Sequence, residues 1–156
     1  MALKIKNNKK NNDIKVTHDQ IRSAGERLHL TFNFSFLTSN KEFNLENTEF
    51  DTAHRNQLLQ RLIELSKEDL IFVKAGKKFN YLECLKKEKL SKCRLKKMSI
   101  HPTFENGSRI KIAGDNFWVF RLYCNNMPLP SRVIGKMIDH TFYVMFIDLK
   151  HALYKG

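Results

Sequence analysis

Near its C-terminal end, this 156-residue chain carries four side chains of types that can act on a phosphate ester: Arg121, Arg132, His151 and Tyr154. A guanidinium presents a planar fork of N–H donors that fits phosphate oxygens. Imidazole carries protons near neutral pH, because its unperturbed pKa is about 6.5. With a phenol beside them, such groups could neutralise a phosphodiester and move the protons that its cleavage requires.

Each of these residues also has a structural interpretation that the sequence leaves open. Arg121 lies between Phe120 and Leu122, and a charge in an apolar strand needs either a salt-bridge partner or a ligand. Arg132 follows a loop and could simply be exposed. A tyrosine near the end of a chain often packs its ring at the edge of the core and leaves its hydroxyl in water.

A second group of residues could bind the backbone of a nucleic acid. The net charge is +12, which favours an anionic partner, and the densest positive stretch lies between residues 86 and 97. The same cations could instead form a solvated surface without a partner. The candidate nucleic-acid-binding residues are Lys86, Lys87, Lys89, Lys92, Arg94, Lys96, Lys97, Lys111 and Lys136.

Several classes of protein are disfavoured by what the sequence lacks. The three cysteines form no C-x-x-C pair, and neither an H-E-x-x-H stretch nor a glycine-rich phosphate-binding loop is present, so we expect no metal and no cofactor. No run of 18 apolar residues predicts a membrane span, and the N-terminus has no apolar signal core. We therefore expect a cytoplasmic protein. The sequence does not indicate a role for the loop histidines His101 and His140.

The four candidate catalytic residues belong to a stretch that predicts three consecutive strands. Residues 116–123, 131–138 and 141–154 are rich in aromatic and β-branched side chains and are bounded by turn-forming residues. Asp139-His140 predicts a tight hairpin turn between the last two. Gly135, inside a strand, predicts a bulge or a close backbone approach. Alternation at residues 109–112 predicts a further strand, which completes a four-strand meander.

The preceding residues predict the elements that cover this sheet. Alternating phenylalanines predict a strand at residues 30–36, and Asp51 or Thr52 can cap a helix that runs to Lys67 with one apolar stripe. Leucines at residues 79–92 predict a second helix.

We therefore expect two segments of unequal character. Residues 1–29 are basic and rich in asparagine, which predicts a flexible N-terminal arm. Residues 30–156 predict a single α+β domain, in which an antiparallel sheet of four to five strands packs against two helices.

This order of elements in a small basic chain resembles the RelE/ParE toxin superfamily over about residues 30–154. The sequence Phe117-Trp-Val-Phe-Arg121 is similar to the family's strand that ends in arginine, and Ser131-Arg-Val-Ile-Gly135 to the strand that follows it. Residues 147–154 are similar to the closing strand, in which a basic or histidine residue precedes a tyrosine. The long loop at 124–131 departs from the family pattern.

The resemblance implies a RelE-like, metal-independent endoribonuclease that cleaves RNA, usually messenger RNA on the ribosome, by attack of a 2′-hydroxyl on the adjacent phosphate. Arg121 and Arg132 would hold phosphate oxygens, and His151 and Tyr154 would carry protons. An acidic antitoxin protein would be the partner that restrains such a toxin. The alternative is a non-catalytic module that binds nucleic acid or a protein, because ParE-like members act on DNA gyrase and lack the RNase residues.

Overall fold

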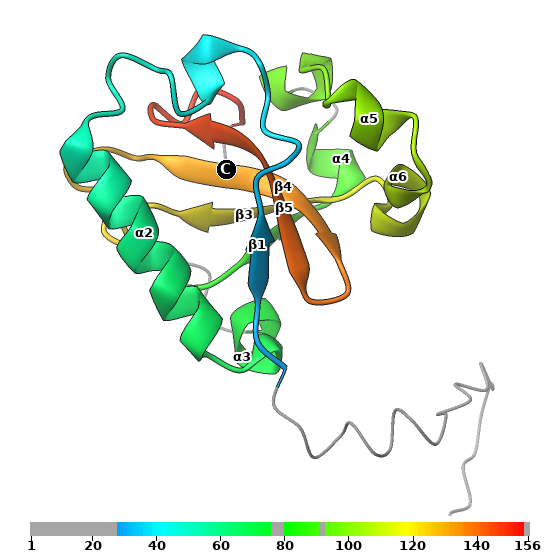
Figure 1. Cartoon of the computed structure of the whole chain (residues 1–156), viewed down its shortest axis with the longest axis horizontal. Coiled ribbons are helices and arrows are strands. Elements are labelled where there is room, and N and C mark those ends of the chain that lie inside the picture. Colours follow the sequence, from blue (N-terminus) through cyan, green and yellow to red (C-terminus); the bar gives the residue numbers. More distant parts are fainter. Residues whose placement is uncertain (1–27, 76–79, 91–92, 155–156) are drawn as a thin grey trace, which may run out of the picture.

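The computed structural model describes residues 28–75, 80–90 and 93–154, apart from the side chain of Lys87. In these residues, five strands form one sheet with helices on both faces (Figure 1). The predicted N-terminal arm lies outside the described part, except for Leu28 and His29, which run beside Asp69 and Leu70. Within the described residues, no helix has the length and apolar character needed to cross a membrane.

The sheet is mixed but mostly antiparallel, in the order β1-β5-β4-β3-β2. Strands β2 to β5 form an antiparallel meander, and β1 adds to it in parallel alongside β5. The predicted α+β class with four to five strands is therefore confirmed in its coarse form. The strands are β1 (Thr31–Asn33), β2 (Glu83–Leu85), β3 (Phe117–Arg121), β4 (Arg132–Ile138) and β5 (Thr141–Asp148).

The β4–β5 hairpin forms as predicted. Asp139 adopts a positive φ of 52°, which suits a tight turn because aspartate tolerates the left-handed region. The register shifts between Ile134 and Gly135, and a Cβ atom on Gly135 would lie 2.1 Å from the carbonyl oxygen of Tyr143. Both the predicted bulge and the predicted close approach are confirmed.

One face of the sheet is covered by α2 (Thr52–Lys67) and α3 (Leu70–Ala75). Helix α2 begins as the sequence predicts, because the Asp51 side chain accepts a hydrogen bond from the backbone N–H of His54. Leu58 and Leu65 are buried against the sheet, as the apolar stripe predicts.

The other face is covered by short helices, which Figure 1 shows away from α2. Their buried side chains pack with the second face of β3, β4 and β5 into a separate apolar cluster. These elements are η1 (Lys41–Phe43), α4 (Lys87–Leu90), η2 (Arg94–Lys97), α5 (Pro102–Glu105) and α6 (Ser108–Ala113).

Two predicted elements are wrong, the predicted strands at 30–36 and 141–154 are shorter than expected, and more helices than the expected two cover the sheet. Residues 79–92 do not form one helix, because residues 83–85 instead pair with β3 as an edge strand. Residues 109–112 lie in a helix, not a strand, and that helix ends at Gly114 with φ of 67°. Ile112 is 66% exposed, so the alternation in this stretch did not mark a buried face.

Candidate functional site

The candidate site lies where three strands meet in one row across the sheet. Arg121, the last residue of β3, is opposite Arg132, the first residue of β4, which is in turn opposite Asp148 at the end of β5. Directly opposite residues on neighbouring strands have Cβ atoms about 5 Å apart and point to the same face. The two arginines identified in the sequence are therefore brought side by side.

Asp148 holds the turn that follows β5. Its carboxylate is 1% exposed and accepts hydrogen bonds from the backbone N–H groups of Ala152 at 2.9 Å and Leu153 at 2.7 Å. Within this turn His151 takes a φ of 55°, and its ring meets that of Tyr154 edge to face with centroids 4.6 Å apart. The buried carboxylate thus sets the position of both candidate proton carriers.

The two guanidinium groups share one acceptor. Arg121 and Arg132 each donate from Nη1 to the side-chain oxygen of Asn126 at 3.0 Å. Arg132 also donates to the carbonyl oxygens of Pro130 and Ser131 at 3.0 Å. Two positive charges are therefore held close together, with the negative charge of Glu83 acting on Arg121, and guanidinium is a group that binds anions well.

This electrostatic environment changes the pKa values of the candidate proton carriers. Burial, and then the positive charge of Arg132, lower the pKa of His151. Burial raises the pKa of Tyr154 to about 12, although a hydrogen bond from Arg132 to its hydroxyl acts in the opposite direction. At neutral pH the imidazole is therefore mainly neutral and can accept a proton, whereas the phenol keeps its proton.

Two residues of the site escaped the sequence analysis. Asn126 sits at φ of 60° in the loop before the Met127–Pro128 bond, and the Asn-Asn-Met-Pro sequence is a turn signal that could have identified it. Glu83 lies in β2, and its negative charge raises the pKa of His151 and of Tyr154. Glu83 gave no signal, because its strand reads as part of a helix.

The four candidate catalytic residues converge, but they are not equally accessible. Arg121 and His151 are half-buried, whereas Arg132 and Tyr154 are each only 4% exposed. Nε2 of His151 is buried and has no hydrogen-bond partner among the described residues. A ligand would therefore meet Arg121 and His151 first, and Arg132 would act mainly through its charge and its hold on the loop.

The basic surface predicted from the sequence adjoins this site. The backbone N–H of Leu95 in η2 donates to the carbonyl oxygen of Leu153 at 2.8 Å, so η2 packs on the turn that carries His151. Arg94 pairs with Glu42 at 2.9 Å and is partly neutralised. The side chain of Lys87 and all of Lys92 lie outside the described residues. The exposed lysines are Lys86, Lys89, Lys96, Lys97 and Lys111.

Lys136 does not belong to this surface, which corrects its placement among the candidate nucleic-acid-binding residues. It is 2% exposed, and its ammonium group donates to the carbonyl oxygens of Gly114 at 2.7 Å and Asn116 at 2.9 Å. The same group lies 4.0 Å from the centre of the Phe117 ring. Burial lowers its pKa to about 8. Lys136 therefore anchors the loop before β3 and cannot reach a nucleic acid.

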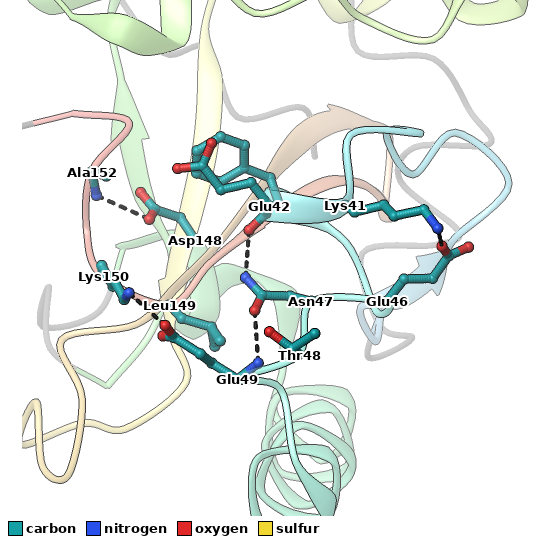
Figure 2. A pocket seen from close by; sticks show the side chains of 11 residues that line it. Lys41, Glu42, Glu46, Asn47, Thr48, Glu49, Asp148, Leu149, Lys150 and Ala152 are labelled. Atoms are coloured by element: carbon teal, nitrogen blue, oxygen red, sulfur yellow. Dashed lines mark hydrogen bonds and ion pairs between the residues drawn. The ribbon is translucent and has the colours of Figure 1, made fainter.

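A hollow of about 340 Å³ lies on another side of the C-terminal turn, between residues 41–49 and 148–152 (Figure 2). Lys150 pairs with Glu49 at 2.6 Å across it, and Lys41 pairs with Glu46 at 3.1 Å. Carboxylates outnumber ammonium groups in its lining, so it does not suit an anion. Across the described part of the chain, no group of three His, Cys, Asp or Glu residues is arranged to hold a metal ion.

Comparisons of this chain with family models, with curated proteins and with solved structures give no match. The RelE/ParE resemblance therefore stays a prediction.

Proposed function

We propose that this chain is an endoribonuclease that cleaves RNA through the substrate's own 2′-hydroxyl group and needs no metal ion. The observation that carries the proposal is the convergence of Arg121 and His151 with the buried pair Arg132 and Tyr154, beside the basic helix η2. RNA is the substrate class that supplies both an anionic phosphodiester and an adjacent hydroxyl nucleophile. Such an activity would take place in the cytoplasm, on free or ribosome-bound RNA.

His151 acts as the general base in this mechanism. Its lowered pKa keeps the imidazole neutral at pH 7, so it can take the proton of the 2′-hydroxyl. The 2′-oxygen then bonds to phosphorus as the bond from phosphorus to the 5′-oxygen breaks. The products are a 2′,3′-cyclic phosphate and a free 5′-hydroxyl, whose oxygen receives a proton from Tyr154.

The arginines and Tyr154 stabilise the negative charge that develops on the phosphate and on the leaving oxygen during this reaction. Arg121 binds the phosphate oxygens in this mechanism, and the guanidinium of Arg132 lies beside it on the neighbouring strand. Tyr154 accepts a hydrogen bond from Arg132, so its own O–H remains available as a donor. With a pKa of about 12, the phenol is protonated before the reaction; it donates this proton to the leaving 5′-oxygen, and the imidazolium of His151 then returns its proton to the phenolate.

Cleavage by the purified full-length chain tests the proposal. We expect labelled single-stranded RNA to be cut in the presence of chelator, and the same sequence with 2′-O-methyl groups to stay intact. His151→Gln should lower the rate by about 10²–10⁴-fold, the usual value of general acid–base help. His140→Gln is the matched control, because His140 lies exposed in the β4–β5 turn. Equal rates for both variants would remove His151 from the mechanism.

The second candidate is a module that binds RNA or an acidic partner protein without cutting. It is favoured by the low exposure of Arg132 and Tyr154 and by the covered Nε2 atom of His151. This function predicts salt-sensitive RNA binding with no strand scission by the wild-type chain. An acidic antitoxin would compete for the same surface, and a pull-down with RNase-treated extract would separate it from RNA-mediated contacts.

A further inference from the structure

A second pocket, of about 470 Å³, opens at the C-terminal end of η2. Its walls come from two segments, residues 38–40 and 97–102. The volume is within the range of about 300–1,000 Å³ that small-ligand sites occupy. It is separate from the hollow of Figure 2, with which it shares no lining residue.

The lining of this pocket combines donors with an apolar surface and includes no carboxylate. Lys97 supplies a positive charge, and residues 38–40 with Ser99 supply hydroxyl and amide groups. Met98, Ile100 and Pro102 supply apolar area. A nucleotide has the matching parts, namely an anionic phosphate, polar edges and the apolar face of a base.

His101 adds a fixed hydrogen-bond donor. Its Nδ1 atom accepts from the backbone N–H of Thr103 at 3.3 Å, so the neutral ring carries its hydrogen on Nε2. The ring also packs edge to face on Phe36, with centroids 5.8 Å apart. On the opposite wall, the N–H of Thr38 donates to the carbonyl oxygen of Met145 in β5 at 2.9 Å. The pocket is therefore held in shape by the sheet.

Helix η2 connects this pocket to the candidate catalytic site. Leu95 is bonded to the C-terminal turn, and Lys97 lines the pocket only two residues later. At about 2 Å of rise per residue, that is about 4 Å along the helix axis. Lys96 and Lys97 are both exposed, so a positively charged surface extends from the C-terminal turn to the pocket.

We infer that this pocket is a nucleotide subsite, which binds one nucleotide of a single-stranded RNA whose neighbouring phosphates cross η2 toward Arg121 and His151. Lys97 contacts the phosphate, His101 and the hydroxyl groups contact polar edges, and the apolar wall receives the base. That the strand is RNA rests on the proposed function. Binding at the pocket does not depend on cleavage.

Binding of a fluorescent, uncleavable 2′-O-methyl RNA hexamer to the full-length chain, measured by anisotropy over a range of salt, tests this inference. Lys97→Ala should weaken binding and reduce the slope of log K against log salt by about 0.7, the contribution of one phosphate on a single strand. Ser99→Trp, which keeps every charge, should weaken binding several-fold by filling the pocket. Lys67→Ala, an exposed lysine of α2, should change neither quantity.

The subsite and the proposed function can fail separately. If Lys97→Ala and Ser99→Trp bind the hexamer as Lys67→Ala does, the subsite is wrong even when RNA is cleaved. If the wild-type chain binds the hexamer as expected but never cuts native RNA, the subsite stands and the ribonuclease does not. If cleavage occurs, Lys97→Ala should raise KM and leave kcat unchanged. His151→Gln should lower kcat and leave KM unchanged.

Discussion

Two buried arginines on opposite faces of the sheet have the same exposure, 4%, and very different surroundings. On the α2 face, Arg61 donates from Nε to the carbonyl oxygen of Arg121, from Nη2 to that of Asn80, and from Nη1 to the carboxylate of Glu64 at 2.7 Å. Its charge is neutralised by an acidic partner. On the other face, the hydrogen-bond acceptors of Arg132 are neutral oxygens.

The difference separates an arginine that ties a helix to the sheet from one that lies beside a second guanidinium. Arg61 ties α2 to the end of β3 and leaves no surplus charge. Arg132 instead lies beside a second guanidinium and lowers the pKa of His151, and the carboxylates of Asp148 and Glu83 lie in the same part of the sheet. Two like charges that lie close together repel each other and are stabilised by a nearby anion, either a carboxylate of the protein or a ligand.

Arg61→Met should have the largest effect on stability and little effect on cleavage. The substitution leaves the carbonyl oxygens of Arg121 and Asn80 without their donor, so we expect the free energy of unfolding to fall by about 3 kcal/mol. Urea unfolding measures this change, and RNA cleavage per folded molecule should be preserved. Arg55→Met is the control, because Arg55 is exposed on the same helix and should cost less than about 1 kcal/mol. A comparable loss in both variants would contradict this assignment.

Asp148→Asn should reduce stability and activity together. The amide cannot accept from the N–H groups of both Ala152 and Leu153 as the carboxylate does, so we expect a loss of about 2 kcal/mol and a displaced His151. Thermal unfolding and the cleavage rate report the two effects. Asp139→Asn, in an exposed turn that asparagine also tolerates, should change neither. Unaltered cleavage by a destabilised Asp148→Asn would show that the turn does not position the imidazole.

Arg121→Gln should have the smallest effect on stability, but it should lower the cleavage rate and change the pH dependence of the activity that remains. Arg121 is one of the positive charges that lower the pKa of His151, and a positive neighbour disfavours the imidazolium. Its removal raises that pKa, so the neutral base is lost at a higher pH as the solution is acidified. We expect the acidic limb of the kcat/KM profile to move to higher pH, and Arg109→Gln on α6 to leave it in place. A limb that moves to lower pH would contradict the proposal that Arg121 lowers the pKa of His151.

The sequence was most informative where local pattern and tertiary structure agree. Helix α2 was predictable with its Asp51 cap because sixteen residues carry one continuous apolar stripe. Strands β3 and β4 and the hairpin were predictable from β-branched and aromatic runs between turn residues. The convergence of Arg121 and Arg132 follows from that meander, since both residues lie at strand ends that share one edge.

The short-helix face was less predictable because its elements are too brief for periodicity to show. Four residues of α4 and three of β2 are too few to repeat either the helical or the strand period twice, and pairing with β3 decides between the two structures. Lys136 resembled a surface cation because its burial depends on the distant carbonyl oxygens of Gly114 and Asn116. The part played by Asn126 likewise depends on a loop conformation that the residue types alone do not fix.

The bulge beside Gly135 determines which face of the sheet the side chains at the C-terminal end of β5 point to. Phe142 and Val144 face the α2 side, and strict alternation would send Phe146 and Asp148 there too. The extra residue, Met145, reverses this parity, so Phe146 packs among the short helices. If Met145 were paired as a regular strand residue, without the bulge, Asp148 would turn toward the hydrophobic side of α2, and the histidine turn would lose its anchor. The bulge at Met145 thus decides which face of the sheet each later side chain of β5 points to.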